Sequence, residues 1–385
     1  MHQLADAARR TRAWACYDCG KCTSTCPVAR AGGHFSPRRN VLAANQVQPE
    51  ALLDDGGLYV CLSCGACDQR CPAEVRYTDL VKELRVYAHE EGYEPECPHG
   101  GALQSLMRMM ARGGTEQDRR GWLDEAGLTG NKQRSEIFYW AGCAVYYDDM
   151  FEEYGVKTLD AARAAVGLIN GLGTNPVVSG EERCCGHDLL WNGDVEHFEM
   201  LARHNTKLIE KSGAEVLVTS CAECLRTLRV EYEPYWEGEP PRMLHISEYL
   251  VEMLGDLDLG EVEGGNGTRR VTYQDPCRLG RHLGVYDPPR QVLEAIPGIE
   301  LTEMGRSRAG AVCCAGSTWS NCDRYAKKIQ VDRLMEAKAT GAEVLVTSCP
   351  KCQIHLSCAM NDPNLEEEIR IEMRDVAELV AAARS

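Results

Sequence analysis

The sequence predicts a multidomain fold, in which an N-terminal α-helical domain precedes a duplicated α/β domain with parallel strands. Three observations predict it. The stretch from Gly213 to Cys224 returns almost unchanged from Gly341 to Cys352, which marks an internal duplication. Within each copy, short apolar runs alternate with helical patterns, as in parallel sheets whose strands are joined by helices. The first 91 residues instead carry two runs of four cysteines.

Composition narrows the class of protein. The chain has 385 residues, of which 21 are cysteine, and it opens without the apolar stretch of a secretory signal. Abundant cysteine in a chain that stays in the reducing cytosol argues for metal ligation or redox chemistry. The formal charge of −16 argues against nucleic acid as a partner. Because no run is long and apolar enough for a membrane helix, we expect a cytoplasmic protein that reaches a membrane only through a partner subunit.

The N-terminal domain is predicted over residues 1–91, and both of its cysteine runs read C-x-x-C-x-x-C-x-x-x-C-P. Runs with this spacing bind cubane [4Fe–4S] clusters, and the fourth cysteine of each run ligates the other cluster. Structural zinc, the alternative, uses C-x-x-C pairs but not two such runs ending in Cys-Pro. The two predicted ligand sets are Cys16, Cys19, Cys22 and Cys71, and Cys61, Cys64, Cys67 and Cys26.

Two helices are expected in this domain. Ser36 before Pro37 has the form of an N-cap followed by the first helical residue. Over residues 77–90, the apolar residues from Leu80 to Ala88 have the spacing of one buried helix face. Gly20 and Gly65, at the same place in the two cysteine runs, are expected to let the backbone turn close to a cluster.

Residues 92–134 are rich in proline and glycine, and we expect a linker that packs between domains, with one helix at 103–112. The first copy of the duplicated domain is predicted over 135–256. It begins with an apolar run at 137–143 that predicts a buried strand. A helix ending near Gly171, a long helix at 195–211 and a strand from Val216 to Cys221 follow.

The second copy is predicted over 268–385 and repeats this order. Strands are expected at 271–277 and 344–349, and helices at 288–295 and 323–339. Between the copies, residues 254–270 are acidic and rich in glycine, and they are expected to form a solvent-exposed joint.

Five cysteines occur in the same order in each copy: a single cysteine, an adjacent pair and a C-x-x-C. Because these groups lie just beyond strands, a parallel sheet carries them to one edge, where such sheets bind ligands. Five thiolates exceed the four that a cubane or a tetrahedral zinc takes, so an unusual multinuclear iron–sulfur centre is predicted in each copy. An ordinary cubane beside buried structural cysteines is the alternative. The sets are Cys143, Cys184, Cys185, Cys221 and Cys224, and Cys277, Cys313, Cys314, Cys349 and Cys352.

This pattern resembles the CCG domains of the heterodisulfide reductase family, on the residues Cys184-Cys185-Gly186 and the C-x-x-C that follows. The fused order, with the ferredoxin-type domain first, is similar to the D-type subunit of the membrane-linked enzyme, and the resemblance covers essentially the whole chain. It implies that each set of five cysteines holds a noncubane [4Fe–4S] cluster. It also implies that a disulfide such as that of coenzyme M and coenzyme B is split between the two clusters, which makes the ten cysteines the catalytic residues.

The resemblance further implies an electron supply. Two cubane clusters would pass electrons inward from a redox partner subunit, which is a b-type membrane cytochrome, a flavoprotein or a hydrogenase. The rival is an electron-relay role, since iron–sulfur subunits of glycolate, lactate and glycerol-3-phosphate dehydrogenases resemble the same layout. Those subunits commonly keep fewer cysteines than a full C-x-x-C. Both C-x-x-C pairs are complete here, which favours disulfide reduction.

Four further residues lie beside the predicted metal ligands. Ala315 stands where the family has glycine, and a positive φ there would cost about 1 kcal/mol or more. His187, His282 and Lys351 lie beside predicted ligands, and they either supply protons to leaving thiolates or hydrogen-bond cluster sulfur and backbone.

Three cysteines lie outside every predicted set. Cys97 is expected to be a spare thiol, and Cys322 and Cys358, on or near predicted helices, are expected to be buried or incidental.

Overall fold

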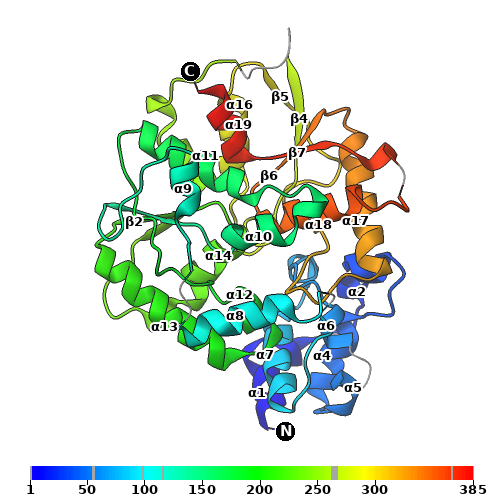
Figure 1. Cartoon of the computed structure of the whole chain (residues 1–385). Coiled ribbons are helices and arrows are strands. Elements are labelled where there is room, and N and C mark those ends of the chain that lie inside the picture. Colours follow the sequence, from blue (N-terminus) through cyan, green and yellow to red (C-terminus); the bar gives the residue numbers. More distant parts are fainter. Residues whose placement is uncertain are drawn as a thin grey trace.

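The computed structural model describes residues 2–53, 57–97, 99–114, 117–261, 268–365 and 367–384. It has the predicted multidomain fold, with a helical N-terminal region and two parallel sheets. Figure 1 shows the N-terminal helices gathered at one end of the molecule and the two sheets toward the other end, where the chain also finishes. Among the described residues, no helix combines the length and the apolar character that crossing a membrane requires.

The N-terminal region is a bundle of short helices around one longer helix. Ser36 accepts a hydrogen bond from the Arg39 amide at 3.4 Å and caps α4, and α7 has the predicted bounds. The first helix, which the sequence pattern did not predict, buries Leu4, Ala7 and Ala8 against α4 and α7. The helices are α1 (His2–Arg10), α2 (Lys21–Thr25), α3 (Pro27–Arg30), α4 (Pro37–Asn45), α5 (Glu50–Leu53), α6 (Gly57–Val60) and α7 (Tyr77–Glu90).

The segment after α7 packs against the α/β body. Its main helix is α8 (Ala102–Arg112), which lies against α13 (Val195–Ser212), and α9 (Gly121–Glu125) follows. Between them, the guanidinium of Arg119 is buried beside the Glu182 carboxylate, with an N–O distance of 2.9 Å. This contact fixes the segment to the loop that leads into the first adjacent cysteine pair.

The first copy forms a three-stranded parallel sheet in the order β1-β2-β3. Its strands are β1 (Ile137–Trp140), β2 (Val216–Thr219) and β3 (Arg242–His245). Its remaining helices are α10 (Ala144–Met150), α11 (Thr158–Gly171), α12 (His187–Asn192), α14 (Ala222–Arg226) and α15 (Ile246–Glu252).

The second copy forms a four-stranded parallel sheet in the order β5-β4-β6-β7, in which β4, β6 and β7 correspond to β1, β2 and β3. Where this copy has β5, the first has only isolated bridges at Val177. The strands are β4 (Arg269–Tyr273), β5 (Ile299–Leu301), β6 (Val344–Thr347) and β7 (Glu372–Asp375). The helices are α16 (Asp287–Ala295), α17 (Arg324–Lys338), α18 (Pro350–Met360) and α19 (Val376–Ala383).

Short helical turns complete the fold. The 3-10 turns are η1 (Ala13–Ala15), η2 (Asp68–Arg70), η3 (Glu152–Tyr154), η5 (Glu233–Tyr235), η6 (Leu254–Asp256), η7 (Arg308–Gly310) and η8 (Glu367–Ile369), and η4 (Thr227–Glu231) is a π-helical turn that continues α14.

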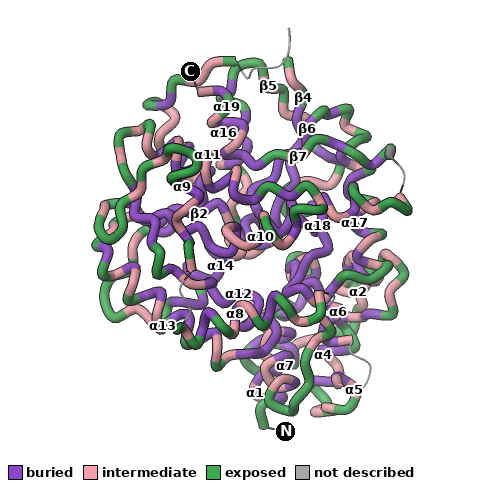
Figure 2. The backbone as a smooth tube through the Cα atoms, in the orientation of Figure 1, coloured by how far each residue is buried: buried purple, intermediate pink, exposed green. Residues whose placement is uncertain are grey.

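The two copies share a hydrophobic core instead of folding apart. Helix α11 of the first copy packs against α19 of the second, and α15 packs against α16. Apolar side chains of both sheets, such as Val218 of β2 and Val346 of β6, belong to the same buried cluster. Figure 2 shows buried segments, in purple, concentrated in the interior of the molecule.

The predicted joint between the copies is only partly exposed. Leu257 is buried in the shared core, and Leu259 forms an antiparallel bridge with Arg384. An exposed joint over its whole length is therefore wrong, because apolar side chains between the acidic residues pack beneath the C-terminal helix. Its glycine-rich part, residues 264–267, lies outside the described residues.

Candidate metal centres

The first predicted cubane set lies near the surface. Its cysteines line one cavity of about 30 Å³, with Cys71 of the second run beside three cysteines of the first. Cys19 is exposed and the others are half-buried. Backbone N–H groups point at the sulfur atoms, from Asp18 to Cys16 at 3.4 Å and from Val75 to Cys71 at 3.3 Å. The set brought together is Cys16, Cys19, Cys22 and Cys71.

The second predicted cubane set is buried. A cavity of about 20 Å³ is lined by Cys26 of the first run and by the first three cysteines of the second run, and all four are buried. The Ser63 amide donates to the Cys61 sulfur at 3.3 Å. Both cavities thus have the crossed composition that two interleaved runs predict, and four gathered thiols fit the ligand requirement of a cubane. The set is Cys26, Cys61, Cys64 and Cys67.

The backbone of the two runs turns in the same way. Gly20 and Gly65 have φ of 74° and 75°, as expected for glycines that let the chain turn around a cluster. Asp18 and Ser63, two residues earlier, also have positive φ, at 54° and 44°. These turns aim the amides of residues 18 and 63 back at the sulfur of the cysteine two positions before, which stabilises a thiolate there.

The five cysteines of the first copy meet in one chain of thiol contacts. Hydrogen-bonding contacts run from Cys143 to Cys184, on to Cys185, on to Cys224 and on to Cys221. Two of the five, Cys143 and Cys221, directly follow strand ends and stand at the N-termini of α10 and α14, where the helix dipole favours a thiolate.

The five cysteines of the second copy repeat this chain. Contacts run from Cys277 to Cys313, on to Cys314, on to Cys352 and on to Cys349. Cys349 is the N-cap residue of α18. The predicted gathering of five thiols occurs in both copies, and such donor sets fit iron–sulfur clusters better than a four-coordinate metal ion.

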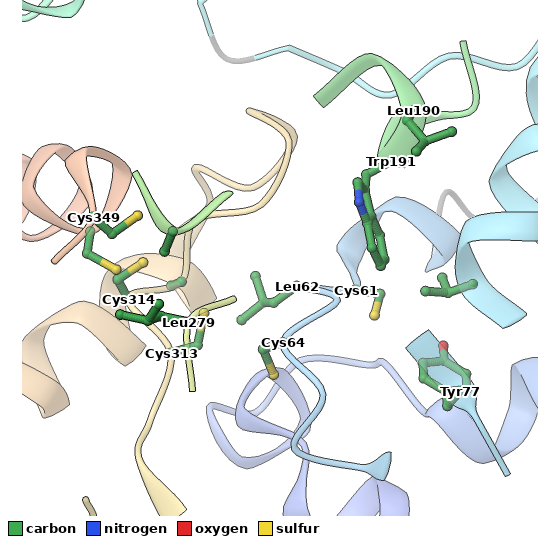
Figure 3. Close-up of a cluster of buried hydrophobic side chains, with 14 of the residues drawn as sticks. Cys61, Leu62, Cys64, Tyr77, Leu190, Trp191, Leu279, Cys313, Cys314 and Cys349 are labelled. Carbon is green, nitrogen blue, oxygen red and sulfur yellow. The ribbon is translucent and has the colours of Figure 1, made fainter. Parts of the chain in front are cut away.

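Two further contacts join the cysteine sets to one another. Cys221 of the first copy contacts Cys349 of the second, and Cys64 of the second cubane set contacts Cys313. In Figure 3, Cys64 and Leu62 lie beside Leu279 and Cys313, with Cys61 on one side and Cys314 and Cys349 on the other. Since Cys67 also lines the cavity of the first cubane set, the four sets form one continuous series.

The two adjacent cysteine pairs are each followed by a left-handed residue. Gly186 has φ of 78°, and Ala315 has φ of 62°. Ala315 therefore has the positive φ that was expected to be unfavourable for alanine. A residue with a Cβ is strained in this conformation. The amide of Gly186 donates to the Cys184 sulfur at 3.3 Å, which explains why the turn is needed.

Buried charges from both copies meet between the two five-cysteine sets. The Lys351 ammonium lies 2.6 Å from the Asp188 carboxylate and 2.7 Å from that of Glu223. Glu223 and Lys351 occupy the same position inside the two C-x-x-C motifs, so this ion pair links equivalent sites of the duplication. Ligand atoms of His187, Asp188 and Glu223 lie within 4.8 Å of one another, but Lys351 already pairs with both carboxylates.

The two histidines beside the predicted ligands are linked through one arginine. Arg278 donates from Nε to His187 Nε2 at 3.0 Å and from Nη1 to His282 Nε2 at 2.8 Å, and it stacks over Trp191. Burial lowers the pKa of His187 and of His282, and both imidazoles are therefore neutral. The sequence pattern indicated the histidines but not Arg278, although its place directly after Cys277 pointed to the site.

A basic cleft opens beside the second cubane set and the second five-cysteine set. It has a volume of about 500 Å³ and lies between the N-terminal region and the second copy, with Cys64 and Cys313 on its wall. The chain as a whole has a net charge of −16, but five basic side chains line this cleft. We call it the basic cleft. The five basic residues are Arg30, Arg70, Arg281, Arg306 and Lys328.

The three cysteines outside the predicted sets are not buried. Cys97 and Cys358 are half-buried and Cys322 is exposed, so of the two alternatives expected for Cys322 and Cys358, buried or incidental, the structure does not show the first. Cys358 is on α18, six residues beyond Cys352, and Cys322 follows the loop that carries Cys313 and Cys314. Both lie on elements that carry the second five-cysteine set, but neither belongs to its chain of thiol contacts.

Known protein families match most of the regions described above. The family described as a cysteine-rich domain, CCG, matches residues 137–229 and 271–357. The family described as a 4Fe-4S dicluster domain matches residues 12–75. Together with the gathered cysteines, these matches define the class: the chain is an iron–sulfur protein in which a dicluster domain precedes two CCG domains.

Similar proteins extend over nearly the whole chain. It is 29% identical to the D-type subunit of dihydromethanophenazine:CoB–CoM heterodisulfide reductase from Methanosarcina mazei, over 96% of this chain and 93% of that protein. It is 27% identical to the B-type subunit of fumarate reductase (CoM/CoB) from Methanothermobacter marburgensis, over 96% and 72%. It is 26% identical to EtfAB:quinone oxidoreductase of Syntrophomonas wolfei, over 95% and 57%.

The chain contains two CCG domains and a 4Fe-4S dicluster domain, as the cysteine pattern predicted, and it is similar over nearly its whole length to the D-type subunit of heterodisulfide reductase. Its relatives are oxidoreductases and subunits of oxidoreductases, and the chain is an iron–sulfur oxidoreductase subunit of this kind.

Proposed function

We propose that the chain reduces a low-molecular-weight disulfide at two noncubane [4Fe–4S] clusters, which two cubane clusters supply with electrons. The observation that carries this proposal is the meeting of two complete five-cysteine sets at Cys221 and Cys349. A relay needs only one path for electrons, whereas a disulfide presents two joined sulfur atoms that must each be received. Two facing sets from a duplicated domain suit such a substrate.

The ligand roles follow from the gathered thiols. The eight cysteines of the N-terminal region would hold the two cubanes, and the ten cysteines of the two copies would hold the two noncubane clusters. When bound, these clusters would supply electrons one at a time and iron that interacts with sulfur. Electrons would enter at the first cubane set, because its Cys19 is exposed, and would pass through the buried second set to Cys313.

Reduction of a disulfide consumes two electrons and two protons and releases two thiols. Before protonation, the leaving sulfur atoms carry negative charge. Arg278 places a buried positive charge beside Cys277, and a hydrogen bond to His187 holds it in position, whereas the Lys351 charge beside Cys349 is already paired with Asp188 and Glu223. We assign to Arg278 the stabilisation of developing thiolate charge, because a fixed charge in a buried site is effective there.

The electron donor is proposed to be a separate redox protein, of the b-type cytochrome, flavoprotein or hydrogenase class. The relatives named as subunits of heterodisulfide and fumarate reductases work within larger enzymes, which supports a partner for this chain. Such a partner would contact the exposed first cubane set.

Iron analysis is the first test. Anaerobically purified protein is expected to contain about sixteen iron atoms per chain, and a count of about eight would contradict the two noncubane clusters. Cys224→Ser should lower the iron content, whereas the matched control Cys97→Ser should leave it unchanged.

A second experiment separates disulfide reduction from electron relay. Reduced protein is mixed with the coenzyme M–coenzyme B heterodisulfide, and free thiols and the EPR spectrum are recorded. Release of about two thiols per disulfide with a new paramagnetic signal is expected. Full iron content without a new paramagnetic signal would instead support the relay role, which the similarity to EtfAB:quinone oxidoreductase suggests as the second candidate.

The basic cleft makes a prediction about the substrate. Arg30 and Arg70, both exposed, have no ion-pair partner among the residues that the structure describes, so they are available to an anionic ligand. Arg70→Glu is expected to raise the KM for a disulfide that carries anionic groups by about tenfold, with little change in kcat. An equal effect on a neutral disulfide such as hydroxyethyl disulfide would contradict an electrostatic role for the cleft.

A further inference from the structure

Cys322 and Cys358 are a pair of neighbouring thiols that none of the proposed centres uses. Their thiols are in hydrogen-bonding contact. Cys322 is exposed and Cys358 is half-buried, so small molecules can reach the pair from solvent. In this respect the pair differs from the two five-cysteine sets, in which eight of the ten thiols are buried.

A lysine completes the arrangement. The Lys327 ammonium, on α17, lies 3.5 Å from the Cys358 sulfur and 3.4 Å from the Cys358 carbonyl oxygen. It is held there by Asp362, at 3.5 Å. The contact with Cys322 and the charge of Lys327 together lower the pKa of Cys358 to about 6, against the effect of burial. A cation and a neighbouring thiol are the surroundings that activate cysteines for exchange.

The pair joins two segments that carry the second five-cysteine set. Cys322 ends the loop that starts at Cys313 and Cys314, and Cys358 is on the helix that starts after Cys349. The loop is well fixed. Trp319 stacks on Phe151 and donates to the Asp188 carboxylate at 3.0 Å, and Asn321 donates to the Tyr59 carbonyl at 3.1 Å.

We propose that Cys322 and Cys358 form a dithiol site, separate from the metal centres, which reacts with low-molecular-weight disulfides and closes to an intramolecular disulfide. The inference does not depend on the proposed function, since it applies equally to an electron relay.

The chemistry is thiol–disulfide exchange in two steps. The Cys358 thiolate attacks one sulfur of a disulfide RSSR; the S–S bond breaks, a mixed disulfide forms, and RS⁻ leaves and takes a proton from solvent. Cys322, as the thiolate, then attacks the Cys358 sulfur, and the second RS⁻ leaves and is protonated. In total, two cysteine thiols and RSSR give one protein disulfide and two RSH. The two electrons that reduce RSSR come from the two cysteines.

The test uses the anaerobic, cluster-containing full chain and hydroxyethyl disulfide as the probe. After reaction, free thiols are blocked with N-ethylmaleimide at acidic pH, and the peptides are analysed by mass spectrometry. In the unaltered chain, Cys322 and Cys358 are expected to be recovered as one cross-linked peptide pair. In Cys322→Ser, Cys358 is expected to be recovered as a mixed disulfide with the probe, because the resolving thiol is absent. Cys97→Ser is the control and should behave as the unaltered chain.

Iron content distinguishes this site from a metal site. Both Cys322→Ser and Cys358→Ser should keep the iron content of the unaltered chain, and a loss in either variant would overturn the proposal, since the residue would then be a ligand. Failure to recover the cross-linked pair would overturn it as well. So would a mixed disulfide on Cys358 in the unaltered chain as abundant as in Cys322→Ser, because the two thiols would then not react with each other.

Discussion

Ala315 illustrates how a single residue can carry strain at a candidate metal centre. It adopts φ of 62° directly after Cys314, in the turn that Gly186 makes after Cys185 in the other copy. Alanine in this region is less favourable than glycine by about 1 kcal/mol. The turn places both sulfur atoms of the adjacent cysteine pair in the chain of thiol contacts of the second copy.

We therefore expect Ala315→Gly to raise the free energy of unfolding, by about 0.5–1 kcal/mol after allowing for the greater freedom of glycine in the unfolded chain. Equilibrium unfolding in urea under anaerobic conditions measures this difference. The reverse change, Gly186→Ala, should lower the free energy of unfolding by more than about 1 kcal/mol, because a Cβ there would also lie 2.7 Å from the Phe198 ring. A destabilised Ala315→Gly variant would contradict the assignment of strain to this turn.

At the residue scale, the sequence predicted which cysteines gather but not how the backbone presents them. Spacing alone indicated all eighteen cysteines as candidate ligands, since the two cysteine runs and the duplication can be recognised in the sequence. The positive φ of Asp18 and Ser63 was missed, because Asp and Ser adopt this conformation only in particular tertiary surroundings. Arg278 was missed because a buried arginine between two histidines reflects contacts that only the tertiary fold creates.

Among the elements, α7 ties the N-terminal region to the α/β body through one buried arginine. Arg85 donates hydrogen bonds to the carbonyl oxygens of Leu58, Tyr59 and Cys61, and to that of Trp191 on α12. It is fully buried. The guanidinium thus satisfies four carbonyl groups, three of them in the segment that leads into the second cubane set.

Arg85→Met should lower the free energy of unfolding by about 3 kcal/mol or more, because several buried carbonyl groups lose their donor. It should also lower iron content, since the Cys61 carbonyl would no longer be held. Both effects can be measured on one anaerobic preparation, by urea unfolding and iron analysis. Arg9→Met is the matched control: Arg9 is exposed and forms a surface pair with Asp6, so a change within about 0.5 kcal/mol is expected.

The strands and helices differ in how readily the sequence predicted them. Strands β1, β2 and β6 are apolar runs and were predicted, as was the part of β4 from Val271. Strands β3 and β7 were missed, because charged or polar residues occupy at least two of the four positions in each; β7 consists of Glu372-Met-Arg-Asp375. Short helices such as α12 were missed as well, since six residues carry too little periodicity to be recognised without their packing.

For the molecule as a whole, the duplication sets equivalent residues against each other across the interface of the two copies. Cys221 meets Cys349, and Glu223 meets Lys351. His245 and Asp375 occupy equivalent N-cap positions of α15 and α19, and each forms a capping box. The sequence predicted the duplication but not that the two copies pack against each other. Their relative orientation depends on the packing of α11 against α19 and of α15 against α16.

His245 makes the contact between the copies sensitive to pH. Its Nδ1 accepts a hydrogen bond from the Ser247 amide at 3.1 Å, and its Nε2 lies 3.1 Å from the Ser348 carbonyl oxygen of the other copy. Burial lowers the pKa of His245 to about 4, against about 6.5 in an unfolded chain. A lowered pKa means that the unfolded state binds the proton first, so the stabilisation is complete above pH of about 6.5 and is lost as pH falls toward 4.

Between pH of about 7 and about 5.5, this histidine should lower the free energy of unfolding by about 1 kcal/mol. In His245→Gln, which keeps a donor and an acceptor but does not titrate, that part of the pH dependence should disappear. His34→Gln, at an exposed site, serves as the matched control for the substitution itself. The measurement is a series of anaerobic urea titrations across this range. Equal slopes in His245→Gln and the unaltered chain would contradict the assignment.

Lys351 provides the strongest test of the interface, because it pairs with two carboxylates of the other copy. Its side chain and that of Asp188 are almost fully buried, so Lys351→Met removes the cation that pairs with Asp188 and Glu223. We expect a loss of about 3–5 kcal/mol in the free energy of unfolding. Lys328→Met, which breaks the exposed pair with Asp332, should change the free energy of unfolding by less than about 1 kcal/mol.

The double variant Lys351→Met, Asp188→Asn should recover part of the loss, because one unpaired charge is removed. If it does not, the two copies are held together by their apolar helices, and the buried charges serve the chemistry of the centres instead.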